Sequence, residues 1–279
     1  MFTRIIQRHN DTPKVLLVPQ NSFAIDHPYC KVEWTNHYGE IFLSCCASLS
    51  LFSYTSVSQK LWALSMMARA RPKLNHITGL NFWKLCGSGT GEGFTPKPNW
   101  GVYGLIGSWE SLDTAKSQIH NHELFRLFGR RATSSRHLLM TPITSRGLWS
   151  GTNPFSTREA TRVEDRPIAA LTRATLRARK ASAFWKRVPD ISARIGEDSS
   201  VLFKIGLGEL PLIQQITFSI WPNTHAMDAF ARTGAHAEAI RAVYKEGWFR
   251  EDLYARFIIN DQVGEWSQNY FQSQLRQNA

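Results

Sequence analysis

Two short segments in different halves of the chain carry the same pattern, and this recurrence limits the folds that the chain can adopt. Residues 82–87 read FWKLCG and residues 202–206 read LFKIG, and the glutamates Glu92 and Glu209 follow them. Each segment is followed by a strand-like run that ends in tryptophan, at Trp109 and at Trp221. Matching segments of this kind indicate that one structural unit occurs twice.

The elements predicted from periodicity and turn residues have the same order in both halves. In the first half we expect strands at 39–54, 80–85, 101–109 and 137–144, with helices at 57–68 and 111–128. In the second half we expect strands at 167–177, 201–208, 214–221 and 253–259, with helices at 181–195 and 223–246. Strand, helix, strand, strand, helix, strand is the order of a ferredoxin-like unit. We therefore predict an α+β fold of two ferredoxin-like βαββαβ repeats, with antiparallel sheets that face an apolar interior suited to a cofactor.

Turn residues and polar stretches predict the boundaries of these units. We expect an irregular N-terminal extension at 1–37, a first unit at 38–145, a connection at 146–166, a second unit at 167–262 and a C-terminal tail at 263–279.

Helix caps and an apolar stripe are predicted for the helices of the first unit. Thr55 or Ser56 is the expected N-cap of the first helix, and Ser111 or Asp113 that of the second. Pro72 is expected to end the first helix. Its core-facing stripe is predicted to contain Val57, Leu61, Leu64 and Ala68.

The charge of the chain indicates a partner with an acidic surface. Lysine and arginine number 33 against 22 aspartates and glutamates, which gives a net charge of +11. No helix-turn-helix, RNP or zinc-finger pattern accompanies the basic residues, so we expect an anionic membrane surface and no nucleic acid. No apolar run reaches the roughly 18 residues of a membrane span, and no signal peptide is recognised, so a cytoplasmic location is expected. The four cysteines lack C-x-x-C spacing, which argues against structural zinc and a disulfide framework.

A stretch with four alternating glycines, residues 81–96, fails the phosphate-binding templates, and its Glu92 would repel a phosphate. It is either a simple connection or a loop that closes over a ligand. Within it, Cys86 is either a thiol whose pKa Lys84 lowers or a buried strand cysteine. Glu92 and Glu209 either form a proton-handling pair or form ion pairs with Arg173 or another of the many arginines.

His236 is the candidate metal ligand among the nine histidines. With Ile240 and Val243 it follows the spacing of one apolar helix face. Such a histidine is either a hydrogen-bonded core residue or an axial ligand for haem iron. For His120 and His122 we expect a solvated helix end, and for His225 a structural role.

Five segments of the sequence resemble the spheroidene monooxygenase family, the acyclic carotenoid ketolases. They read FWKLCGSGTGEGFTP from Phe82, RGLWSGTNPF from Arg146, PIAALTRATLR from Pro167, FKIGLGELPLIQQITFSIWP from Phe203 and AIRAVYKEGWFREDLYARF from Ala239. The resemblance spans about residues 38 to 260. It implies that a haem b enzyme uses O2 and reduced ferredoxin to introduce a keto group into an acyclic carotenoid.

The second half is similar, more distantly, to the haem-binding half of aldoxime dehydratases. This resemblance implies a dimeric α/β-barrel with His236 as the proximal iron ligand and with Ile240 and Trp221 beside the haem. We expect Lys84, Trp83 and Arg173 on the distal or propionate side.

Two other functions are kept open, a haem-dependent aldoxime dehydratase-like lyase and a non-enzymatic carrier of carotenoid or lipid. For the ketolase we expect a peripheral position at the inner face of the membrane, and the sequence leaves open whether the chain forms a homo-oligomer.

Overall fold

The computed structural model describes most of the chain from residue 46 onward. Side chains are described for residues 46–90, 95–155, 157, 166–186, 201–230 and 246–266, and the backbone alone for residues 2–9, 12–19, 33–35, 41–43 and 231–232. His236 and Ile240 therefore lie outside the described residues.

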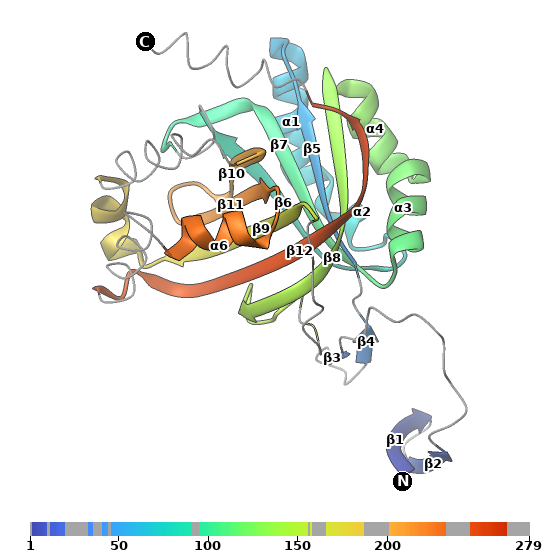
Figure 1. Ribbon diagram of the computed structural model, residues 1–279. Coiled ribbons are helices and arrows are strands. Elements are labelled where there is room, and N and C mark those ends of the chain that lie inside the picture. Colours follow the sequence, from blue (N-terminus) through green and yellow to red (C-terminus); the bar gives the residue numbers. More distant parts are fainter. Residues whose placement is uncertain are drawn as a thin grey trace.

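An antiparallel barrel of eight strands forms the centre of the molecule (Figure 1). The strands follow one another around the barrel in the order β10-β11-β9-β12-β8-β5-β7-β6. Their bounds are β5 (Cys46–Ser53), β6 (Leu80–Gly89), β7 (Pro98–Trp109), β8 (Ser134–Gly147), β9 (Ile168–Leu176), β10 (Phe203–Leu210), β11 (Gln214–Trp221) and β12 (Phe249–Glu265). Each of the eight predicted strands of the two units contains or overlaps one of these.

The two halves of the barrel have the same strand order. When the strands are numbered within each half, β6-β7-β5-β8 and β10-β11-β9-β12 both read 2-3-1-4. The halves meet along a long ladder between β8 and β12 and a short one between β6 and β10. The short ladder has only two residue pairs, Leu207 with Ser88 and Gly208 with Gly87. We call it the β6–β10 seam.

Four helices pack against the outer face of the first half, as Figure 1 shows. They are α1 (Val57–Arg69), α2 (Arg71–Leu74), α3 (Leu112–Asn121) and α4 (Glu123–Arg131), while α6 (Thr224–Arg232) lies on the second half. None of the helices within the described ranges is long and apolar enough to span a membrane. For the helices predicted at 181–195 and 223–246, the parts at 187–195 and 233–245 lie outside the described residues.

The helix caps agree with the sequence at two positions and differ at a third. Ser56 caps α1 in a capping box with Gln59, and Ser111 caps α3. The helix predicted at 111–128 is two helices, because His122 is extended and ends α3. Its Nδ1 accepts a hydrogen bond from the backbone N–H of Leu124 and so caps α4, a role that differs from the solvated helix end expected for it. Pro72 lies in the first turn of α2, just after α1 ends.

The stripe predicted for α1 faces the wrong way. Its four residues are exposed, whereas the side chains that pack on the barrel are Ala63, Met66 and Ala70. Both faces of α1 are apolar, so periodicity alone does not identify the inner one. Trp62 also packs on this side, with its ring centre 6.0 Å from that of Tyr54 and 5.6 Å from that of Phe128.

Side chains alternate across the barrel wall. On β6, Phe82, Lys84 and Cys86 point into the barrel, and Trp83 and Leu85 point outward beneath the helices. The interior is apolar, as predicted, and it is filled by packed side chains, including Leu51, Ile106, Phe155, Phe218 and Phe257.

The N-terminal extension is not irregular throughout. Strand β1 (Phe2–His9) pairs with β2 (Thr12–Pro19), and β3 (Glu33–Thr35) pairs with β4 (Ile41–Leu43). The strand expected at 39–54 is likewise two strands, β4 and β5, in different sheets.

Candidate functional site in the barrel interior

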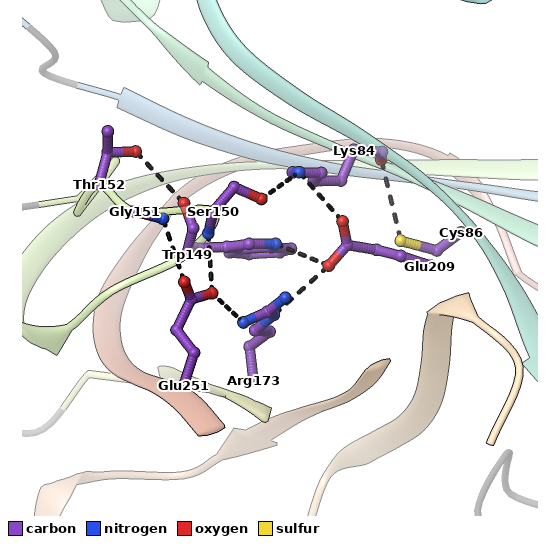
Figure 2. A network of polar contacts seen from close by, with 9 residues as sticks. All are labelled: Lys84, Cys86, Trp149, Ser150, Gly151, Thr152, Arg173, Glu209 and Glu251. Atoms are coloured by element: carbon purple, nitrogen blue, oxygen red, sulfur yellow. Dashed lines mark hydrogen bonds and ion pairs between the residues drawn. The ribbon is translucent and has the colours of Figure 1, made fainter. Parts of the chain in front are cut away.

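A buried arginine is the centre of a polar network inside the apolar barrel (Figure 2). Arg173 on β9 has only 1% of its side chain exposed. Its Nε lies 3.4 Å from Glu209 Oε1, and its other end pairs with Glu251 Oε1. A buried guanidinium needs partners of opposite charge, because desolvation otherwise makes it very costly. Of the two alternatives for Glu209, the ion pair with Arg173 is confirmed, and Glu92 lies outside the described residues.

Lys84 extends the network across the β6–β10 seam. Its Nζ lies 3.1 Å from Glu209 Oε2 and donates a hydrogen bond of 2.7 Å to Ser150 Oγ. Two cations and two carboxylates therefore balance each other. The structure brings Lys84 and Arg173 together around Glu209, as Figure 2 shows.

The loop after β8 enters this network from the connection between the two halves. Trp149 is fully buried, and its indole N–H donates to Glu209 Oε1 at 2.7 Å while its ring lies 5.8 Å from the guanidinium of Arg173. The backbone N–H groups of Ser150 and Gly151 donate to the two oxygens of Glu251, at 2.8 and 3.1 Å. Ser150 has a φ of 56° and Gly151 one of 81°, a left-handed pair that directs both N–H groups toward one carboxylate.

Glu251 is held in its ionised form by this loop. Burial is the largest single influence and raises its pKa. The hydrogen bonds from Ser150 and Gly151, together with Arg173, outweigh burial and lower the pKa below its usual value. Glu251 is therefore not a proton donor near neutral pH.

Cys86 lies beside the network but is not an activated thiol. It is fully buried, and burial is the main reason that its pKa rises well above the ordinary value. The Glu209 carboxylate raises it further, and the nearby cations do not reverse the effect. Lys84 does lower the pKa of this thiol, but burial and Glu209 outweigh it, so Cys86 is not activated and the alternative of a buried strand cysteine is confirmed.

Trp83 lies on the opposite side of the barrel wall from Lys84. Its indole N–H donates to Asn75 Oδ1 at 3.0 Å, and the guanidinium of Arg71 lies 5.9 Å from its ring. Adjacent residues of a strand point to opposite faces, so Trp83 is part of the helical layer. The structure does not bring it together with Lys84 and Arg173.

Trp221 lies on the outer face of the second half, away from the network. It is buried in a cluster with Ile143, Ile168 and Met227, and its ring centre lies 4.9 Å from that of Phe230 on α6. His225 is exposed in the first turn of the same helix. His236 and Ile240, our candidates for holding haem, follow α6 in the sequence beyond the described residues.

The sheet face beside Trp221 has side chains that suit a planar cofactor. Ala170 pairs with Ser219 and Thr172 with Thr217, and all four side chains point outward and are half-buried. Side chains this small let a flat ring system lie close to a sheet, so the described residues fit a haem at this face. Within the described ranges, no group of three or more His, Cys, Asp or Glu could hold a metal ion.

Sequence reasoning missed three members of the network, Trp149, Ser150 and Glu251. Trp149 and Ser150 fall in the segment that we expected to be a connection. One signal in the sequence could have identified them. All three residues lie in two of the segments that resemble the spheroidene monooxygenase family, RGLWSGTNPF and AIRAVYKEGWFREDLYARF. Each of the five segments contributes a residue to the network: Lys84, Trp149, Arg173, Glu209 and Glu251.

Comparison of the fold finds aldoxime dehydratases among similar solved structures. One aldoxime dehydratase has a TM-score of 0.57 at 10% identity, with 88% of this chain and 91% of that chain covered. The aldoxime dehydratase OxdRE in complex with butyraldoxime has a TM-score of 0.52 at 10% identity, over 79% and 82% of the two chains. At this identity the likeness shows a shared fold.

No family model matches the sequence, but curated relatives do. The spheroidene monooxygenase of Rhodobacter capsulatus is 46% identical over 222 residues, which cover 79% of this chain and 92% of that protein. Those of Cereibacter sphaeroides and Rubrivivax gelatinosus are 44% and 33% identical, over 78% and 74% of this chain and 68% and 79% of theirs. The chain therefore belongs to the spheroidene monooxygenase family of oxidoreductases.

Proposed function

We propose that this protein introduces a keto group into an acyclic carotenoid of the spheroidene type, with O2 as co-substrate and a ferredoxin-like protein as electron donor. The observation that carries this proposal is the 46% identity to a spheroidene monooxygenase over 92% of its length. The network supports it as well, since each segment on which the resemblance rests supplies one of its residues.

We infer further that the two halves are ferredoxin-like repeats that together form a dimeric α/β-barrel. The identical strand order 2-3-1-4 in both halves supports this inference. So does the likeness to an aldoxime dehydratase of which 91% of the chain is covered.

We assign haem b as the cofactor, with His236 as iron ligand and with Trp221 and Ile240 beside it. Haem supplies the activation of O2 when it is bound. The half-buried face of Ala170, Thr172, Thr217 and Ser219 would receive its ring.

The roles that we propose for Lys84 and Arg173 follow from their contacts. Both cations are already paired with carboxylates, so we assign them the ordering of residues 149–151 at the barrel interior rather than a direct bond to the cofactor. The prediction that Trp83 also acts near the cofactor stays a prediction. Its place in the helical layer makes it the weakest of the three candidates.

Absorption spectroscopy tests the cofactor assignment. Purified protein should show a Soret band, and His236→Ala should weaken or shift it because the axial ligand is lost. His225→Ala is a matched control, since His225 is an exposed histidine in the first turn of α6. Unchanged haem content and an unchanged spectrum in His236→Ala would remove that residue from the role.

Product analysis tests the reaction. Protein supplied with an acyclic carotenoid, O2 and a reductant should convert a methylene group into a carbonyl, and mass spectrometry should detect the exchange of two hydrogens for one oxygen. The oxygen should come from labelled O2. Without reductant the conversion should stop.

The likeness to aldoxime dehydratases favours a second candidate, a haem-dependent lyase that dehydrates an aldoxime. Turnover of an aldoxime in the absence of reductant would identify it. A third candidate, a carotenoid or lipid carrier, would bind carotenoid but contain no iron after expression with ample haem.

The proposed location is the cytoplasm, with the protein resting peripherally on the inner face of the membrane. The net charge of +11 supports attraction to anionic lipid.

A further inference from the structure

The outward face of α1 is apolar along its whole length. Val57, Leu61 and Leu64 are 73%, 63% and 44% exposed, and Ala68 continues the same line. The spacing i, i+4, i+7, i+11 places these side chains in one row at the centre of the exposed face. Nine large apolar residues are exposed among the described residues, and three of them are on this one helix. Such a concentration of exposed apolar side chains marks a surface that binds a protein, a membrane or a ligand.

Basic residues surround the row, and acidic ones are absent from both helices. The segment from Val57 to Leu74, which forms α1 and α2, contains Lys60, Arg69, Arg71 and Lys73 and no Asp or Glu. Arg131 adds a cation from α4, since its guanidinium lies 5.7 Å from the ring of Trp62 on α1. An apolar row with a cationic border is the pattern of a helix that lies in the surface of an anionic membrane.

We propose that this surface, formed by Val57, Leu61 and Leu64 with their basic border, docks the protein on an anionic lipid bilayer. Leucine and valine side chains would enter the boundary of the acyl chains, and the cations would contact the headgroups. This surface is the face that would contact the membrane in the peripheral position proposed above. The inference rests on the proposed function in one respect, because it takes the bilayer as the source of the carotenoid.

Vesicle binding tests the apolar row. The full protein should co-sediment with vesicles of phosphatidylcholine and phosphatidylglycerol that contain no carotenoid. The triple variant Val57→Ser, Leu61→Ser, Leu64→Ser should bind at least about tenfold more weakly, since each lost apolar contact removes a favourable transfer term. Leu210→Ser with Val263→Ser is the matched control, because these side chains are 51% and 45% exposed on other elements and should not affect binding.

The ionic part of the surface has its own test. Lys60→Gln, Arg69→Gln and Lys73→Gln together should weaken binding to the phosphatidylglycerol vesicles and abolish much of its salt dependence. The pair Arg179→Gln, Lys180→Gln removes exposed cations from the second half and serves as control. Vesicles of phosphatidylcholine alone should bind all of these proteins equally weakly.

Several results would overturn the proposal. They are failure of the unsubstituted protein to bind the anionic vesicles, equal binding by the triple serine variant, or conversion of a dimer to a monomer by that variant in light scattering. The last would make the surface a contact between two copies of the chain. Thermal unfolding checks that the variants are folded. Ketolase activity measured with carotenoid in detergent micelles separates a failed docking surface from a failed function, because micelles supply substrate without a bilayer.

Discussion

The ammonium group of Lys84 lies 3.1 Å from the carboxylate of Glu209, and this ion pair crosses the β6–β10 seam. The seam has only two backbone residue pairs, whereas the other junction of the two halves, between β8 and β12, is paired over most of both strands. Glu209 also accepts hydrogen bonds from Arg173 and Trp149. One carboxylate thus links the first half, the second half and the loop between them.

Replacing Glu209 by glutamine should therefore destabilise the barrel. The amide keeps the shape and an acceptor oxygen for Trp149, but it leaves Lys84 and Arg173 without their shared negative charge. Because the Glu209 side chain is only 10% exposed, we expect the free energy of unfolding to fall by about 2–3 kcal/mol. Urea unfolding followed by far-UV circular dichroism measures it.

Asp261→Asn is the control for this prediction. It removes the ion pair with Lys116, which is exposed, so the free energy of unfolding should not change measurably. Equal losses in the two variants would show that the position of Glu209 at the seam has no special importance.

His137 should make stability depend on pH. It lies in β8, with its side chain on the helix-covered face of the first half. Its Nδ1 lies 2.8 Å from Ser50 Oγ, its ring lies next to those of Phe52 and Phe125, and burial lowers its pKa from 6.5 to about 4. The unfolded chain takes up a proton near pH 6.5, which the folded chain resists. The contribution of neutral His137 to the free energy of unfolding is therefore complete above pH 6.5 and is lost as the pH falls toward 4. By about pH 5 the free energy of unfolding should be lower by about 1–2 kcal/mol.

Unfolding of His137→Gln checks this assignment. Glutamine does not titrate, so the variant should lose less stability than the unsubstituted protein between about pH 7 and pH 5. Its stability at neutral pH reports separately on lost packing. Parallel pH profiles for the two proteins would contradict the assignment.

Cys86 should resist alkylation while the protein is folded. Its thiol is buried and its raised pKa leaves little thiolate near pH 8, so iodoacetamide should modify it only after unfolding in urea. Peptide mapping by mass spectrometry distinguishes Cys86 from the other cysteines. Rapid modification of Cys86 in the folded protein, slowed in the Lys84→Met variant, would instead show that Lys84 activates this thiol.

The sequence predicts the strands of the barrel well, because β-branched and aromatic residues at alternating positions respond to the local geometry of a sheet. β11 has the bounds expected for it, Gln214–Trp221. The orientation of α1 was not predictable in the same way. With apolar residues on both faces, only the shape of the barrel beneath selects Ala63 and Met66 as the inner ones.

The candidate site was predictable in part. Lys84, Arg173 and Glu209 are charges within otherwise apolar strands, which marks them as buried and paired. Glu251 and the loop residue Trp149 reach them only through the closure of the barrel, which no local pattern encodes. The position of Trp83 was deducible, because a residue next to Lys84 on one strand must point to the other face.

Gly147 and Gly87 should differ in how far their replacement by alanine lowers the free energy of unfolding. Gly147 has a φ of 90°, and a Cβ there would lie 2.3 Å from the backbone oxygen of Asp252. Gly147→Ala should lower the free energy of unfolding by at least about 2 kcal/mol, because neither backbone can yield easily. Gly87 belongs to the stretch 81–96, for which we expect a connection or a loop, but it lies in β6. A methyl group on its Cα would meet no atom within 4 Å beyond its chain neighbours, so Gly87→Ala should be tolerated. Urea unfolding of both variants decides the matter, and a comparable loss at Gly87 would show that the seam beside it requires a bare backbone.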